Sequence, residues 1–353
     1  MKKFIVKEVF DEASGNNTAG SKARIDIEYI AEKQGFHKFP IYLKKPGSEK
    51  KSIFKQVADH IYVYNTWKSA LDEIEDAYLI IQFPIVNGFI FLKNLLTKLK
   101  KKNVKTIAVI HDLETLRAAK VDNISYKRRK RLYIQEIPPL REFDYIVSHN
   151  NRMTEYLVSC GIKRNHIIDL NIFDYIVERP YREKYSENNA IIVAGNLSRQ
   201  KAAYIYNLPS NVSFELYGTN YLDDTKRNVH YNGAFPADQI VDVLDGKFGL
   251  IWDGNRRDTC NGVFGEYLKY NNPHKTSLYL AAGIPVIVWS QAAIKSFIVD
   301  NELGVAIDSL DDLNEVMRVY TGERYKKLKD NAQKMSDKLR TGHYFKEVIK
   351  QIR

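Results

Sequence analysis

The chain has 353 residues, of which 44% are hydrophobic and 27% are charged, with two cysteines and a formal net charge of +11. This composition excludes a disordered, collagen-like or disulfide-stapled chain, and the length predicts two domains. The longest apolar stretch is shorter than the roughly 20 residues of a membrane-spanning helix, and residues 1–10 lack the pattern of a secretory signal. We therefore expect a cytoplasmic protein.

The first half of the chain alternates β-branched or aromatic runs with amphipathic stretches, which is typical of a parallel sheet covered by helices. The expected strands are 3–10, 38–43, 77–83, 104–110 and 144–149, and the expected helices are 21–34, 52–74, 86–101, 134–142 and 152–160. The pattern lapses over 175–189, a polar stretch with Pro180. We place the linker between domains there.

The second half repeats the alternation. Strands are expected at 190–194, 213–217, 248–252, 285–289 and 305–307, and helices at 236–244, 273–282 and 292–301. A loop of 18 residues, 254–271, interrupts this half, and residues 310–353 are strongly helical. The pattern predicts two α/β domains, 1–175 and 190–335, and a C-terminal helix, 336–353, that packs back toward the first domain.

The positive charge is concentrated between Lys93 and Arg131, where 13 Lys and Arg stand against three acidic residues. Two runs, 98–105 and 127–131, carry most of it. Such a patch attracts a nucleic acid or an anionic lipid surface, while a solvated helix face with a loop is the alternative. Tyr126 is its only aromatic residue and no nucleic-acid motif accompanies it, so we expect peripheral contact with an anionic membrane and no nucleic acid.

Several catalytic signatures are absent from the sequence. It has no Gly-x-Gly-x-x-Gly, Gly-x4-Gly-Lys-[Ser/Thr], Gly-x-Ser-x-Gly or His-Glu-x-x-His motif. This argues against a dinucleotide oxidoreductase, a P-loop NTPase, an α/β hydrolase and a zincin. There is also no Asp-x-Asp of the kind that holds a metal against a diphosphate. We therefore expect a bound diphosphate to be neutralised by protein groups, with no metal.

The strongest candidate for a phosphate site is the start of the helix 273–282. Asn272 suits the N-cap, Pro273 the first helical position and Gly283 the stop. The helix N-terminus, Lys275 and His274 would then point at one spot that suits a phosphate. A well-capped helix with an ordinary surface lysine is the alternative, although a cation in the first turn opposes the helix dipole.

Further candidates follow other strands. After the strand 190–194, Gly195 permits a tight turn and Arg199 offers a planar head that matches phosphate oxygens. Tyr217 ends the next strand and would flank a base or ribose, or else is a core residue. In the first half, His111 and Asp112 follow the strand 104–110, where either would serve as a general base or as a loop anchor.

The chain resembles bacterial galactofuranosyltransferases that build surface polysaccharides. The strings that carry the resemblance are Ala194–Arg199, Gly249–Gly254 and Gly265–Leu280, together with Ile110–Asp112, Ser148–Asn150 and Arg340–Gly342. The chain is also similar to the glucosyltransferases that extend N-acetylglucosamine on serine-rich adhesins, which share Ala281–Val286.

This resemblance implies an α/β protein with the GT-B fold, in which two Rossmann-like domains face each other across a cleft. The C-terminal domain would bind a UDP-sugar and the N-terminal domain the acceptor. Arg199 and Lys275 would hold the diphosphate, Tyr217 and Asp253 would lie near the nucleotide, and Asn16 would approach the reaction centre. The other donor-binding residues that we predict are Lys201, Glu266, Asn272, His274 and Thr276.

The resemblance also bears on the mechanism. The Glu-x7-Glu pattern of many retaining GT-B enzymes is missing, because the expected positions hold Tyr270 and Leu278. We therefore prefer direct, inverting displacement with Asp112 as the base and His111 beside it.

The expected function is transfer of a hexosyl group, with galactofuranosyl as the best guess, from a UDP-sugar to a sugar hydroxyl of a cell-surface glycan precursor. The acceptor would be a carbohydrate, a lipid-linked glycan or a glycoprotein, and no metal or other cofactor is expected. The alternatives are a glucosyltransferase acting on a serine-rich adhesin, a nucleic-acid-binding protein and a non-catalytic partner subunit. The sugar, the linkage and the oligomeric state, including a homo-oligomer, stay open.

Overall fold

The computed structural model describes residues 1–10, 19–44, 53–86, 91–119, 124–179, 188–222 and 227–352. Asn16, which we predicted near the reaction centre, lies outside the described residues, as does most of the expected linker.

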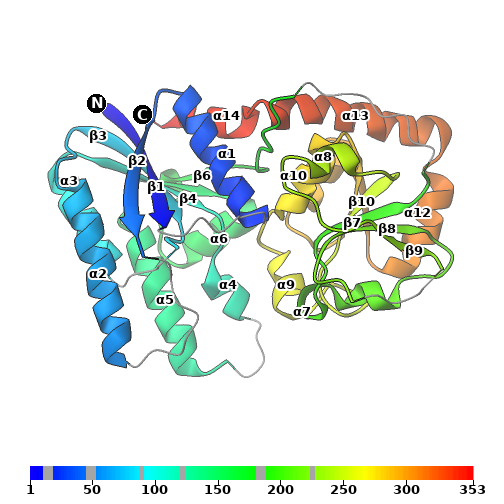
Figure 1. Ribbon diagram of the computed structural model, residues 1–353, viewed down its shortest axis with the longest axis horizontal. Helices are drawn as coiled ribbons and strands as arrows, with labels where there is room; N and C mark the ends of the chain where they lie inside the picture. Colours follow the sequence, from blue (N-terminus) through cyan, green and yellow to red (C-terminus); the bar gives the residue numbers. More distant parts are fainter. Residues whose placement is uncertain are drawn as a thin grey trace. The chain divides into compact units, whose positions relative to one another are not determined.

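The chain forms two compact units, each built around its own sheet (Figure 1). The first unit comprises the described residues up to Leu170, except 19–26, together with 346–352. The second comprises 19–26 and 171–345. The segment 19–26 joins the second unit through Asp26, whose carboxylate accepts a hydrogen bond from the Ile176 N–H at 3.1 Å.

The first unit has a six-stranded parallel sheet in the order β2-β1-β3-β4-β5-β6. Its strands are β1 (Lys2–Phe10), β2 (His37–Leu43), β3 (Ala77–Phe83), β4 (Lys105–Ile110), β5 (Tyr145–Ser148) and β6 (Ile167–Asp169). Its helices are α1 (Ala19–Lys33), α2 (Ile53–Leu71), α3 (Leu92–Lys101), α4 (Glu114–Ala119), α5 (Tyr126–Leu140) and α6 (Asn151–Ser159). The near-continuous burial of β3 and β4 is what a parallel sheet covered on both faces requires.

The second unit has another six-stranded parallel sheet, in the order β12-β11-β10-β7-β8-β9. Its strands are β7 (Ile191–Asn196), β8 (Phe214–Thr219), β9 (Val229–Tyr231), β10 (Phe248–Ile251), β11 (Val286–Trp289) and β12 (Gly304–Ile307). Its helices are α7 (Arg199–Ala202), α8 (Ile240–Val243), α9 (Gly262–Tyr267), α10 (His274–Ala281), α11 (Lys295–Asp300), α12 (Leu313–Val319) and α13 (Gly322–Arg340). The chain ends in α14 (His343–Gln351).

The predicted class of two Rossmann-like units is confirmed, and every predicted strand is present. Two short edge strands, β6 and β9, were not predicted. Because each has only three residues, its pattern is too brief to separate it from a loop.

At two places the structure has more helix than the sequence predicts. Helix α5 begins at Tyr126 and includes the whole basic run 127–131, because the Ser125 side chain caps it by accepting the Arg128 N–H. The expected loop 254–271 contains α9. Helix α9 packs closely against the end of β10, since a Cβ on Gly265 would lie 2.7 Å from the Asp253 carbonyl oxygen.

Among the described residues, no helix combines the length and the apolar character needed to cross a bilayer.

Candidate functional site

Lys275 lies at the carboxyl edge of the second sheet, in the first turn of α10. Its Nζ donates to Asp253 Oδ1 at 2.9 Å and to the Trp252 carbonyl oxygen at 2.8 Å. Both side chains of this ion pair are largely buried, with 13% and 7% of their surface exposed. An ammonium group has three N–H donors, so one remains for a ligand.

A second cation stands close to this pair. Burial lowers the pKa of Lys275, and the carboxylate of Asp253 partly opposes this by raising it. Lys201 on α7 is near enough to lower the pKa of Lys275 further. The Lys201 carbonyl oxygen accepts the Gly254 N–H at 2.8 Å, which ties α7 to the turn after β10. Two cations against one carboxylate leave a net positive charge, and this favours an anion.

Thr276 follows Lys275, and its Oγ1 is buried with no hydrogen-bond partner among the residues described. A buried hydroxyl without a partner costs about 1–3 kcal/mol. We call Lys201, Asp253, Lys275 and Thr276 the Lys275 cluster. Its cations and its unsatisfied hydroxyl suit the oxygens of a phosphate.

The start of α10 differs by one residue from the prediction. The helix begins at His274, and Pro273 is the residue before it, with no side-chain cap. Asn272 does not cap the helix, because its Nδ2 donates to the Asn171 carbonyl oxygen at 2.7 Å. The predicted capping role of Asn272 is therefore wrong, and its side chain anchors the loop to the segment that follows β6.

His274 packs in the interior beside the same segment. Its ring stacks on Tyr175 at 5.1 Å between centroids and meets the Phe173 ring edge-on at 6.1 Å. Burial, with a smaller effect of Lys22, lowers the pKa of His274 to about 3. The imidazole is thus neutral at pH 7, and the arrangement is that of a packing residue.

The C-terminal end of α10 is held from the other side of the helix. Arg340 donates through Nη1 to the Ala281 carbonyl oxygen at 3.1 Å, and Ser336 donates to the same atom at 2.6 Å. A cation at a helix C-terminus stabilises the helix dipole. This contact therefore supports the helix that presents Lys275.

Arg199 is exposed on α7, two residues before Lys201. Its guanidinium carbon lies 4.0 Å from the centre of the Tyr206 ring, and Tyr206 stacks almost parallel on Tyr221. A stacked guanidinium is pre-oriented while its N–H donors stay available around its edge.

We expect Arg199→Ala to lower turnover at least about tenfold, equivalent to 1.4 kcal/mol, because a charge-assisted bond to the leaving diphosphate is lost. Arg199→Lys should recover only part of this, since an ammonium neither stacks nor binds bidentately. Steady-state kinetics of UDP release would measure both, with the neighbouring exposed Gln200→Ala as the control. Unchanged kinetics in Arg199→Ala would refute the diphosphate role.

Two other predicted donor residues have different surroundings. Tyr217 is buried, and its hydroxyl accepts the Asp245 N–H at 3.2 Å, on the segment entering the amino end of β10. The structure therefore makes it a core residue and does not bring its hydroxyl to the Lys275 cluster. Glu266 on α9 accepts from Lys269 Nζ at 2.9 Å.

In the first unit, His111 and Asp112 follow β4 at the carboxyl edge of the sheet. His111 Nε2 lies 2.8 Å from Gln82 Oε1, and Gln82 Nε2 donates to Glu28 Oε1 at 3.3 Å. Because the amide nitrogen faces Glu28, Gln82 presents its oxygen to His111, which requires a proton on Nε2. Asp112 Oδ1 accepts from Arg117 Nη2 at 2.6 Å. Both titratable groups are thus oriented by partners.

These orienting partners were not predicted from the sequence. Gln82 is a polar residue inside the otherwise apolar strand AYLIIQF, and this pattern was a usable signal. Arg117, the partner of Asp112, and Tyr206, the partner of Arg199, gave no such signal, because nothing in the neighbouring sequence distinguishes them from surface residues. His149, which follows β5, also supports this edge: it contacts the Ile110 carbonyl oxygen at 3.0 Å, and burial lowers its pKa to about 4.

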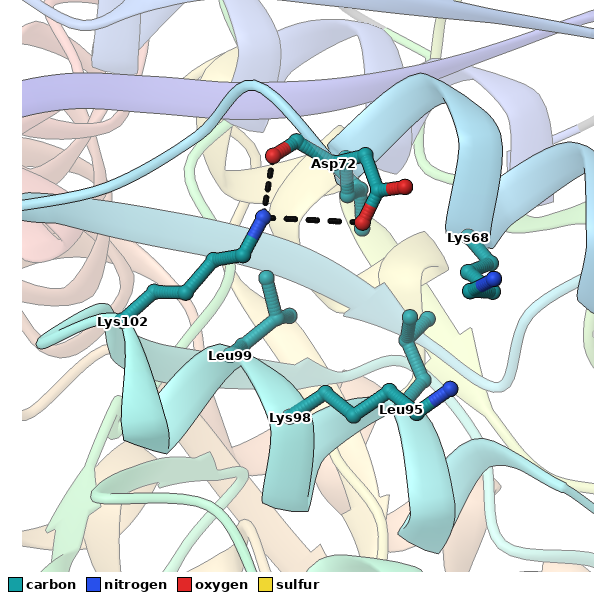
Figure 2. A pocket seen from close by; sticks show the side chains of 7 residues that line it. Lys68, Asp72, Leu95, Lys98, Leu99 and Lys102 are labelled. Atoms are coloured by element: carbon teal, nitrogen blue, oxygen red, sulfur yellow. Dashed lines mark hydrogen bonds and ion pairs between the residues drawn. The ribbon is translucent and has the colours of Figure 1, made fainter.

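The basic run 98–105 borders a small hollow at the end of α3. Figure 2 shows Lys102 reaching Asp72, with its Nζ donating to the Asp72 carbonyl oxygen and lying 3.5 Å from Asp72 Oδ1. Lys68 and Lys98 also line the hollow. The hollow has a volume of about 10 Å³. That is room for one water at most, so it is no ligand site.

No group of three or more His, Cys, Asp or Glu side chains within the described ranges is arranged to hold a metal ion.

Two family models match the chain. The C-terminal domain of the glucosyltransferase 3-like family matches residues 191–352, and its N-terminal domain matches residues 2–172. Their boundaries agree with the pattern of two α/β units.

Individual proteins are also similar to this chain. The β-1,6-galactofuranosyltransferase WbbI of Escherichia coli K12 is 37% identical over 279 residues, which is 78% of each chain. Glucosyltransferase 3 of Streptococcus gordonii is 25% identical over 95% of this chain and 94% of its own. Among solved structures, Anabaena HepE in complex with UDP superposes with a TM-score of 0.60 at 11% identity, covering 100% of this chain and 99% of its own. These likenesses confirm the GT-B fold.

Proposed function

The chain belongs to the glucosyltransferase 3-like family and is a glycosyltransferase, and from this we propose that it transfers a galactofuranosyl group from a UDP-sugar to a sugar hydroxyl of a surface glycan precursor. The observation that carries the proposal is the Lys275 cluster, a buried cationic site at the sheet edge where open α/β units bind ligands. The 37% identity to a galactofuranosyltransferase supports the choice of sugar.

The proposed reaction is a direct displacement. Asp112 accepts the proton of the acceptor hydroxyl while the hydroxyl oxygen attacks the anomeric carbon of the donor sugar. The bond from that carbon to UDP breaks, and its electron pair leaves on the diphosphate. Arg199, Lys201 and Lys275 stabilise that developing charge, at about 1.5–3 kcal/mol for each charged hydrogen bond. The name of the E. coli relative specifies a β-linkage, which is the configuration that inversion of an α-linked donor produces.

These protein cations would also make a metal unnecessary. The proposal therefore includes transfer without a metal.

Glucosyl transfer to a glycoprotein is the second candidate. It is favoured by the Streptococcus gordonii relative, whose likeness extends over 95% of this chain. The two candidates share the UDP site and differ in the hydroxyl contacts of the sugar.

A thermal-shift and calorimetry panel of UDP-glucose, UDP-galactopyranose, UDP-galactofuranose and UDP-N-acetylglucosamine tests the proposal. UDP-galactofuranose is expected to bind most tightly and to be turned over equally well with EDTA present. Tighter binding of UDP-glucose would favour the second candidate. No binding of any UDP-sugar, or a requirement for added Mg²⁺, would contradict the proposal.

A further inference from the structure

A pocket of the first unit is lined by residues of α4, α5 and α6. Its volume is about 360 Å³, within the range of small-molecule sites. The residues that line it are Thr115, Ala118, Tyr126, Arg129, Lys130, Tyr133 and Tyr156. Three tyrosines and two cations thus converge on one cavity that the proposed donor site does not use.

Helix α5 turns one face toward this pocket. Its four lining residues, Tyr126, Arg129, Lys130 and Tyr133, are spaced i, i+3, i+4 and i+7, which places them along one side of the helix. All four are exposed. A row of residues at this spacing normally packs against the core. Because this row is exposed and consists of tyrosines and cations, ligand binding explains it better than packing within the fold does.

The charge of this helix end is costly without an anion. The first turn of α5 contains no acidic residue, and cations there oppose the helix dipole. Within the part of the chain that the structure describes, Lys130 forms no ion pair. An anion in the pocket would offset both effects.

The opposite wall is held rigidly. The buried Glu136 carboxylate accepts the N–H groups of Glu114 and Thr115, at 2.7 and 2.9 Å, and the Thr115 hydroxyl at 2.6 Å. These bonds fix the start of α4 to α5. A wall that is already ordered lowers the entropic cost of binding.

Helix α4, which lines the pocket, also carries Arg117, the ion-pair partner of the proposed base. Arg117 on α4 orients Asp112, and its chain neighbour Ala118 lines the pocket. A ligand in the pocket therefore lies in the same unit as the group that would activate the acceptor hydroxyl.

We propose that this pocket binds a phosphate-bearing sugar as part of the acceptor, with the phosphate on Arg129 and Lys130 and the sugar ring against the tyrosines. This inference rests on the proposed function. Guanidinium and ammonium groups suit phosphate oxygens, and aromatic faces offer the apolar surface that a sugar ring covers. The phosphate is that of a lipid-linked glycan or of a free sugar phosphate.

Calorimetry on the full chain tests the pocket with glucose 1-phosphate as the probe and methyl glucoside and inorganic phosphate as comparisons. The double variant Arg129→Gln/Lys130→Gln is expected to weaken glucose 1-phosphate binding at least about tenfold, through loss of charge-assisted bonds. Tyr133→Ala should weaken glucose 1-phosphate more than inorganic phosphate. The matched control is Arg128→Gln/Arg131→Gln, which removes the same charge from the same exposed run but not from the pocket; it should change binding less than twofold.

Other outcomes overturn the proposal. Equal losses in the two double variants would mean a diffuse cationic surface, and inorganic phosphate binding as tightly as glucose 1-phosphate would mean that no sugar is recognised. Vesicles of phosphatidylcholine with and without phosphatidylglycerol test whether the residues bind an anionic membrane instead. If vesicle binding depends on Arg129 and Lys130 and glucose 1-phosphate binding does not, these residues form a membrane surface and not a sugar phosphate pocket. UDP affinity is measured in every variant. If the wild-type chain binds UDP but not glucose 1-phosphate, only the proposal for this pocket is overturned. If the wild-type chain does not bind UDP, the result counts against the proposed function.

Discussion

Asp112→Asn is expected to lower the rate of sugar transfer by about 100- to 10,000-fold, the usual contribution of a general base, while leaving UDP affinity unchanged. Asparagine keeps nearly the same volume, and its carbonyl oxygen still accepts the Arg117 hydrogen bond, but it cannot take a proton. UDP affinity should persist because the Lys275 cluster belongs to the other unit. Folding stability should change by no more than about 1 kcal/mol, since the Asp112–Arg117 pair is partly exposed.

The measurement is release of UDP in the presence of alkyl glycoside acceptors, with UDP affinity by calorimetry on the same preparations. His111→Asn is the companion variant, because His111 lies beside Asp112 and is oriented by Gln82. A larger loss in His111→Asn than in Asp112→Asn would move the base to His111. Equal loss of transfer and UDP affinity in Asp112→Asn would indicate a structural role.

Lys275→Met is expected to weaken UDP binding by about 10- to 150-fold, since a charged hydrogen bond contributes about 1.5–3 kcal/mol. It should also destabilise the fold by about 3 kcal/mol or more, because Asp253 is left buried without its partner. Lys275→Met/Asp253→Leu separates the two effects. Stability should largely return in this double variant, whereas UDP binding should not.

The pKa of Lys275 also predicts how binding depends on pH. Burial lowers this pKa from its ordinary value, so the ammonium loses its proton earlier on the alkaline side than an exposed lysine. Neutral Lys275 cannot donate a charge-assisted bond, so UDP affinity should fall as the pH rises through this pKa. Calorimetry from pH 7 to 10 should show this fall in the wild-type chain and not in Lys275→Met. A parallel fall in both would assign the titration to another group.

The sequence alone determined the architecture. Alternating apolar runs and amphipathic stretches are local patterns, and they predict two α/β units because strand and helix periods differ. The same local logic placed Lys275 in the first turn of a helix and His111 and Asp112 after a buried strand. Periodicity could not find α5's true start, because the run 127–131 is polar on every side.

Only the tertiary structure decided which side chains meet. Asp253 and Lys275 are 22 residues apart, and His111 and Gln82 are 29 apart, so no local pattern could pair them. The direction of a side chain also depends on packing from distant segments: Asn272 turned to Asn171 instead of capping α10, and His274 turned to Tyr175. Periodicity depends on residues that are neighbours in the sequence, whereas the partners of a buried polar group come from distant chain segments that folding brings together.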